Sequence, residues 1–189
     1  MSISTTYTTQ NELLLNNLMV FYRNEEYLSR MLKIITGESK ISLRIVDWFA
    51  TNYAKKYYTL YIINLTPENK IRFKVYFDYK LKLKAYSKKR FDPFCRWDRI
   101  SIPYKNGTSI ETTIGQLNFF KWAIENKVIE YIENNYDDIE KDMNTRNSTS
   151  KRKDIVIDNS KTRKKREELS VSATKSIKKE EVEIVVQFN

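Results

Sequence analysis

The sequence predicts an α+β fold, an antiparallel sheet of two hairpins packed against N-terminal helices and one long helix, with a flexible basic linker and a C-terminal strand. Three observations predict it. Apolar residues recur at helical spacing near the N-terminus and again after residue 112. Alternating or β-branched stretches separated by turn signals lie between these regions. Beyond residue 143 the chain becomes polar and basic, so we expect one domain at 1–143, a linker at 144–168 and a β-strand tail at 169–189.

Helices are predicted in the first part of the chain. Over residues 11–36 the apolar side chains lie three or four positions apart, with a break near Asn24 and with Gly37 placed as a stop signal. Residues 41–56 repeat this spacing and form a second amphipathic segment. Trp48 lies beside its apolar face, so we expect it in the core.

A long hairpin is predicted next. Residues 57–64 are β-branched and aromatic, and Pro67 follows in a turn position. From residue 70 to residue 86 the odd positions are apolar or aromatic and most even positions are cationic, which predicts a strand with one face toward the core. Such a strand would extend about 56 Å, longer than an ordinary strand, so we expect a bulge or break near residues 78–80.

A second hairpin is centred on the pair Asn106-Gly107, one of the strongest turn signals in a sequence. It joins residues 99–104 to residues 109–113. The segment before it, residues 90–99, alternates arginines with aspartates, so we expect a cluster of local ion pairs there.

A long helix is predicted after this hairpin, capped by Thr112 or Thr113 and running to about Met143. Its last turns are acidic, with six carboxylates against Lys141 between residues 130 and 142. Negative charge at a helix C-terminus opposes the helix dipole. We therefore expect basic residues of a neighbouring sheet, or of another subunit, to offset it.

The chain ends with a predicted strand at 182–188, rich in β-branched residues. A strand beyond a flexible linker needs a sheet edge, either its own or that of a neighbouring molecule. Both alternatives stay open. Exchange of this strand between subunits would produce a homo-oligomer.

The composition excludes several classes of chemistry. The chain has no histidine and a single cysteine, Cys95, which removes His-centred catalytic triads and cysteine or histidine zinc sites within one chain. No glycine-rich phosphate loop is present. We therefore expect no enzyme activity, no cofactor and no resident metal, with Cys95 as a buried structural residue. No apolar run approaches the roughly 18 residues of a membrane span, so no membrane partner is expected.

Basic residues are concentrated in two places, and they carry the functional prediction. The net charge is +10, and nine cations against Asp78 lie between residues 70 and 90. Clustered cations on one surface favour a polyanion such as nucleic acid. The predicted phosphate-binding residues are Lys70, Arg72, Lys74, Lys80, Lys82, Lys84, Lys88, Lys89 and Arg90, assisted from the linker by Arg163, Lys164, Lys165 and Arg166.

Four stretches resemble a family of proteins in nucleocytoplasmic large DNA viruses, particularly the mimivirus-like giant viruses. They read ISLRIVDWFATNYAKK, LKAYSKKRFDPFCRWDRI, TTIGQLNFFKWAIENKVIEYI and, near the end, ELSVSATKSI with VEIVVQF. These motifs identify a family and are not catalytic signatures. The resemblance implies the viral factory in the host cytoplasm, or the virion, as the setting.

Together these observations predict a non-enzymatic viral DNA-binding or scaffold protein that organises or condenses the genome through sequence-independent contacts. DNA and RNA are not distinguished by the residues. The alternative is a protein-interaction or regulatory module in viral transcription, whose basic face meets an acidic protein. A Mg²⁺-dependent nuclease using Asp92 and Asp98 is the third hypothesis.

Overall fold

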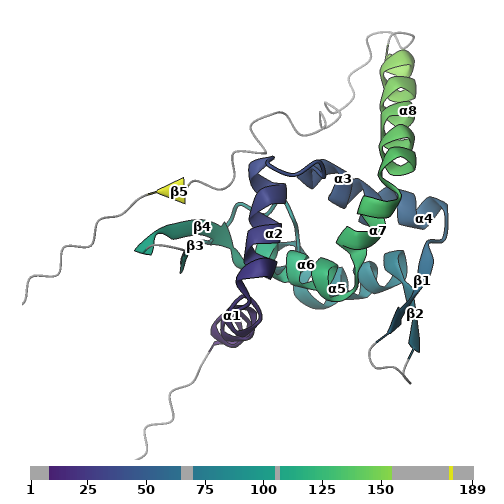
Figure 1. The fold of residues 1–189 in the computed structure, drawn as a ribbon. Helices are drawn as coiled ribbons and strands as arrows, with labels where there is room; N and C mark the ends of the chain where they lie inside the picture. Colours follow the sequence, from purple (N-terminus) through teal and green to yellow (C-terminus); the bar gives the residue numbers. More distant parts are fainter. Residues whose placement is uncertain (1–8, 65–69, 105–106, 155–178, 181–189) are drawn as a thin grey trace, which may run out of the picture.

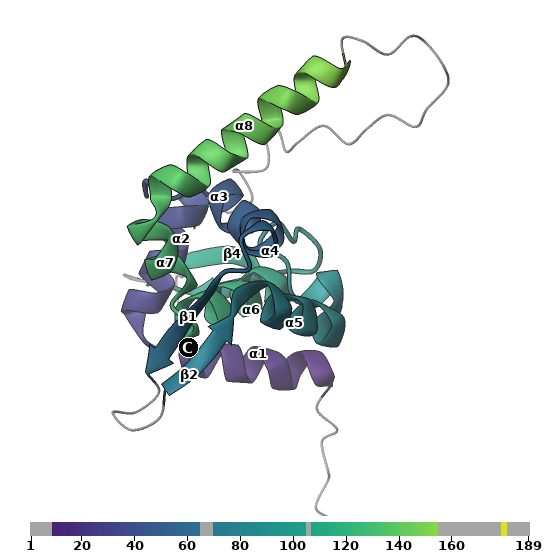
Figure 2. The ribbon, with the colours of Figure 1, turned by 90° about the vertical axis from the view of Figure 1, so that its right-hand side faces the viewer.

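The computed structural model describes residues 9–64, 70–104, 107–154 and 179–180, and it confirms the predicted α+β class. Two β-hairpins lie on opposite sides of a helical body (Figures 1 and 2). The hairpins belong to separate sheets rather than to one. Within the described residues, no helix combines the length and the apolar character that crossing a bilayer requires.

The N-terminal helices follow the sequence signals closely. Helix α1, Gln10–Phe21, begins with a capping box between Thr9 and Glu12. Helix α2, Glu25–Thr36, is capped by the Asn24 side chain and ends at Gly37, whose φ of 79° is left-handed. The break near Asn24 and the stop at Gly37 are therefore confirmed.

The predicted helix over 41–56 is present, with a change of winding in its middle. It consists of α3 (Leu43–Trp48), the π-helical η1 (Phe49–Tyr53) and α4 (Ala54–Lys56). Ser42 caps its start by accepting a hydrogen bond from the backbone N–H of Ile45. Trp48 is buried, as expected.

The first hairpin is shorter than predicted. Strand β1, Leu60–Asn64, pairs in antiparallel register with β2, Lys70–Lys74. At Val75 the chain turns into helix α5, Val75–Arg90, so the prediction of a strand from 70 to 86 is wrong beyond Lys74.

The apolar residues of α5 also fit a helical spacing, which the two-residue alternation in the sequence obscures. Val75 and Tyr79 are buried, and Leu83 and Tyr86 pack partly against the core, which is helical spacing. The intervening apolar residues Phe77 and Leu81, expected in the core of a sheet, are 57% and 66% exposed. Packing against a helix selects every third or fourth residue, and here it overrides the two-residue period.

The second hairpin joins β3, Arg99–Pro103, to β4, Ser109–Thr113. Strand β5, Lys179–Glu180, pairs with Ser109 and Ile110 of β4 in the same chain (Figure 1). The predicted terminal strand at 182–188 lies outside the described residues.

The predicted long helix is divided into three. Helix α6, Ile114–Glu125, is capped by the Thr113 side chain. Helix α7, Val128–Asn134, follows Lys127, whose φ is 57°, and α8, Tyr136–Asp154, begins after Asn135. The backbone of α8 continues to Asp154, ten residues past the predicted start of the linker at residue 144.

This division removes part of the predicted conflict with the helix dipole. Asp137 and Asp138 lie in the first turn of α8, where negative charge is favourable, not at a helix C-terminus. Arg30 of α2 binds Glu130 at 2.9 Å and Glu133 at 2.8 Å. The predicted offset by a neighbouring sheet or subunit is therefore wrong for this pair of carboxylates, because a helix of the same chain supplies it.

Helix α6 occupies the centre of the core, and nearly all of its residues are buried. Its aromatic side chains form a cluster with α5 and the segment after it. Trp122 lies 6.0 Å from Tyr79, 5.6 Å from Phe91 and 5.5 Å from Phe119, measured between ring centroids. Such pairs add to the free energy of burial.

Gly115 is required where α6 begins, because it faces Cys95 closely. A Cβ at this position would lie 2.8 Å from the Cys95 Cβ and 3.0 Å from the carbonyl oxygen of Lys89. Gly115→Ala should therefore lower the free energy of unfolding by about 1–3 kcal/mol in denaturant titrations. In a Cys95→Gly background the same substitution should cost less, and an equal cost in both backgrounds would contradict this contact.

Candidate functional site

The outer face of the first hairpin carries three of the predicted cations. Register pairs place Lys70, Arg72 and Lys74 of β2 opposite Asn64, Ile62 and Leu60 of β1, and all six side chains are exposed. The opposite face directs Phe73 and Ile63 into the core. We call Lys70, Arg72, Lys74, Leu60 and Ile62 the hairpin face.

The cations beyond Lys74 do not continue this face, so the prediction of one ladder of nine is wrong. A helix turns about 100° per residue and distributes alternating side chains around its axis. Lys80 and Lys84 remain exposed, whereas Lys82 is half-buried beside α1 and α6. A backbone break at Ser87, where φ is 60°, separates the three basic residues that follow.

Those three residues, Lys88, Lys89 and Arg90, lie apart from the hairpin face. Lys88 and Lys89 line a cavity described below. Arg90 donates a hydrogen bond to the Gln10 side chain of α1 at 3.3 Å. The predicted residues Arg163, Lys164, Lys165 and Arg166 lie outside the described residues.

The cations of the hairpin face have no carboxylate within ion-pair distance in the described part of the chain, and neither do Lys80, Lys82 and Lys84. Other cations are paired. Lys56 binds Asp142, Lys121 binds Glu125, and Arg99 binds Glu111. The acidic stretch at 130–142 is thus contacted by Arg30, Lys40, Lys56 and Lys127 and not by the basic segment at 70–90.

A groove of about 410 Å³ opens at the Leu60–Lys74 end of the hairpin face, between α4, β1 and the start of α5. Its walls are mainly aromatic and apolar, with two lysines. The residues that matter below are Lys55, Tyr58, Leu60, Lys74, Tyr76 and Phe77. The Lys55 Nζ lies 5.7 Å from the Tyr76 ring centroid, and the Lys74 Nζ lies 6.0 Å from that of Phe77.

Tyr58 holds an unusual conformation in this groove. Its φ is 49°, in the left-handed region that glycine normally occupies after a helix, and its side chain is 77% exposed. The turn is fixed on both sides, because Thr59 donates its backbone N–H to Ala54 O at 3.1 Å and accepts from Val75 N at 3.3 Å. The Tyr58 ring is thereby kept exposed to solvent at the edge of the groove.

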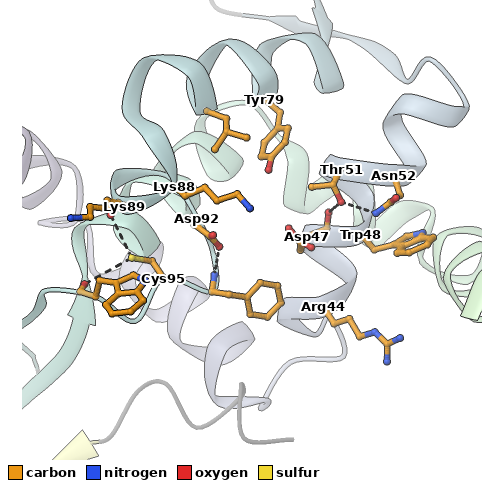
Figure 3. A pocket seen from close by; sticks show the side chains of 13 residues that line it. Arg44, Asp47, Trp48, Thr51, Asn52, Tyr79, Lys88, Lys89, Asp92 and Cys95 are labelled. Carbon is orange, nitrogen blue, oxygen red and sulfur yellow. Dashed lines mark hydrogen bonds between the residues drawn. The ribbon is translucent and has the colours of Figure 1, made fainter. Parts of the chain in front are cut away.

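A second cavity, of about 660 Å³, lies between α3 and η1, α5 and the segment after it. Figure 3 shows Asp47, Tyr79, Lys88 and Asp92 directed into it. Asp92 also accepts the backbone N–H of Phe94 at 2.8 Å. Four titratable groups from three segments, α3, α5 and the residues after α5, therefore face one space.

The two carboxyl groups in this cavity are perturbed. Burial, together with the negative charge of Asp92, raises the pKa of Asp47 to about 7, while Lys88 opposes the shift. Burial also raises the pKa of Asp92, against the hydrogen bond from Phe94 and the charge of Lys88. The arrangement can hold and exchange a proton near neutral pH.

One prediction about this region is wrong, and the two carboxylates of the nuclease hypothesis are not brought together. The expected ion-pair cluster at 90–99 is absent, because Asp92 faces the cavity and Arg99 pairs with Glu111 across the second hairpin. Asp98 is exposed and does not line the cavity with Asp92. Among the described residues, no group of three or more His, Cys, Asp or Glu side chains could hold a metal ion.

Asp47 is the cavity residue that sequence reasoning missed. It lies between two buried residues, Val46 and Trp48, beside the apolar face of α3. An acidic residue beside such a face is the signal that could have identified it. Cys95 is buried, as expected, with its Sγ 3.4 Å from the Lys89 carbonyl oxygen.

The raised pKa of Asp47 predicts how stability depends on pH. The unfolded chain releases this proton near 3.8 and the folded protein near 7, so between these values ionisation favours unfolding by about 1.4 kcal/mol per pH unit. Asp47→Asn removes the ionisable carboxyl group, so the variant does not lose this free energy of unfolding as pH rises. The variant should gain stability over the wild type as pH rises through this window, measured by thermal melts.

The exposed Asp98 provides a matched control, because Asp98→Asn removes one carboxyl group from the surface and leaves the cavity intact. A stability difference between Asp47→Asn and the wild type that stays constant from about pH 4 to pH 8 would contradict the perturbed carboxyl.

Comparison with known proteins bears out the resemblance to a giant-virus family. A curated relative, Uncharacterized protein L507 of Acanthamoeba polyphaga mimivirus, is 45% identical over 148 residues, which make up 75% of this chain and 56% of the relative. The chain thus spans little more than half the length of that relative. No solved structure matches significantly. The model of the Family of unknown function (DUF7197) matches residues 2–189, so the chain belongs to this family.

Proposed function

We propose that this protein binds nucleic acid without sequence selectivity through the hairpin face, and that it organises or condenses viral DNA as a non-enzymatic DNA-binding or scaffold protein. The observation that carries the proposal is the set of three exposed cations, Lys70, Arg72 and Lys74, on one strand face without ion-pair partners among the described residues. Unpaired cations gain most from a polyanion, because no existing ion pair has to be broken.

The geometry of a strand suits this role. Alternate side chains on one face recur about 6.6 Å apart, so the three cations form a short row. The row can meet successive phosphate oxygens, and such contacts hold the nucleic acid without reading its sequence. Lys80 and Lys84, exposed on the adjoining helix α5, extend the positive charge beyond the hairpin.

The setting proposed for this activity is the viral factory in the host cytoplasm, or the virion. The support for it is the 45% identity to a mimivirus protein. Exchange of the C-terminal strand between copies also stays a proposal. Lys179 and Glu180 pair with β4 of their own chain, and in an oligomer the same edge would receive the strand of a neighbour.

A protein-interaction or regulatory module in viral transcription is the second candidate. The observation that favours it is the exposure of bulky apolar side chains beside the cations, with Ile62 61% and Leu81 66% exposed. This candidate requires an acidic protein partner, and it predicts no measurable affinity for DNA.

Replacing Lys70, Arg72 and Lys74 by Gln tests the leading proposal. Each phosphate contact contributes about 0.9 to the slope of log affinity against log salt concentration on duplex DNA, so the slope should become shallower by about 2.7. Fluorescence anisotropy across a salt series measures it. The binding constant of the variant should also fall at low salt for every sequence tested.

A charge-matched control removes three exposed cations elsewhere, Arg23, Lys33 and Lys141, again by Gln. It lowers the net charge equally but leaves the hairpin face intact. If both triple variants lose the same affinity and slope, the interaction depends on net charge alone, and a defined binding face is contradicted.

A further inference from the structure

We infer that the groove beside the hairpin face binds an unstacked nucleobase, so that the protein prefers single-stranded to duplex nucleic acid. The inference rests on the proposed function and specifies its ligand. Proteins that bind single strands combine a basic track for the backbone with aromatic side chains on which bases stack. Here the hairpin face supplies the track, and the groove supplies the aromatic surface.

Three aromatic rings and an aliphatic side chain make the groove suitable for a base. Tyr58, Tyr76, Phe77 and Leu60 line it, and its volume of about 410 Å³ lies within the range of small-ligand sites. Phe77 is 57% exposed and Leu60 is 55% exposed, so neither is used by the core. Every base has an apolar face that such a surface can cover without selecting among sequences.

Charge complementarity favours a nucleotide over a purely apolar occupant. Lys55 and Lys74 belong to the walls of the groove, and each ammonium lies within 6.0 Å of an aromatic ring centroid. Lys74 is shared with the hairpin face, so a strand that follows Lys70 and Arg72 reaches the groove at the next cation. A base could enter the groove while its phosphates contact the lysines. In a duplex the bases are stacked and paired, which prevents this contact.

The backbone of Tyr58 is an independent observation that points to the same site. Tyrosine at a left-handed position is less favourable than glycine, and the ring packs little, being 77% exposed. Strained residues of this kind cluster at binding sites, where the strain positions a side chain for a ligand. The inference explains why a ring occupies a position that the fold would fill better with glycine.

Two substitutions test the groove without disturbing the core. Tyr58→Gly removes the ring and relaxes the backbone, so the melting temperature should stay equal or rise. Phe77→Ala removes a second exposed ring from the first turn of α5. Each should weaken binding to a labelled oligothymidylate by between about 5-fold and 150-fold. Affinity for a duplex of the same length should be unchanged.

Leu81→Ala is the matched control for this test. Leu81 is a similarly exposed apolar residue one turn further along α5, and it does not line the groove. Its removal should leave binding to the single strand unchanged. A wild-type protein with equal affinity for oligothymidylate and duplex would overturn the inference.

The remaining outcomes separate this inference from the proposed function. If the Lys70, Arg72 and Lys74 variant loses affinity while Tyr58→Gly and Phe77→Ala do not, the hairpin face binds nucleic acid but the groove does not bind bases. If none of these variants affects binding, both proposals fail. If Phe77→Ala instead abolishes a concentration-dependent increase in mass and leaves DNA affinity intact, the groove holds a second copy of the chain, which also overturns the inference.

Discussion

The packing of α5 on α6 is the contact on which the rest of the structure depends. Tyr79 lies 6.0 Å from Trp122 and 6.4 Å from Phe119, and the Trp122 indole N–H donates to Asp78 at 2.6 Å. These contacts can form only if the chain leaves the strand at Val75 and continues as a helix. The turn at Val75 then determines which side chains of the basic segment face solvent together.

The change from strand to helix at Val75 produces two separate surfaces. On one side, β2 keeps Lys70, Arg72 and Lys74 in a row, and the first turn of α5 presents Phe77 to the groove with Tyr58. On the other, Tyr79 and Lys88 face the cavity that contains Asp47 and Asp92 (Figure 3). One helix therefore separates a basic and aromatic surface from a cavity with perturbed carboxyl groups. The first presents the cations and rings on which the proposed nucleic-acid binding rests, and the second brings together the two carboxyl groups whose pKa is raised.

Sequence reasoning predicted the elements whose signals are local. The Asn24 cap, the Gly37 stop, the Thr113 cap and the Asn-Gly hairpin each depend on a few neighbouring residues, and their elements are present. The prediction of a strand after Lys74 was wrong because the apolar residues there fit both a two-residue period and a helical period. The contacts of Tyr79 with Phe119 and Trp122, which lie about 40 positions later in the chain, decide between the two.

The candidate site was predictable in part for the same reason. Lys70, Arg72 and Lys74 share a face because they lie on a true strand, as the alternation indicated. The groove and the cavity assemble side chains from distant segments. Tyr58 gave no pattern of its own, and Asp47 gave only the signal of an acidic residue beside an apolar helix face. The acidic end of the predicted long helix was misjudged because a new helix begins after Asn135, a break that the continuous apolar spacing concealed.

The most direct test of this account is a titration of isotope-labelled protein with single-stranded DNA, followed by backbone amide chemical shifts. We predict that the shifts concentrate at residues 58–62 and 70–77, which form the hairpin face and the groove. Helix α2 and the start of α8, where carboxylates gather, should show none. Shifts confined to Asp47, Lys88 and Asp92, or spread evenly over all basic residues, would contradict the account.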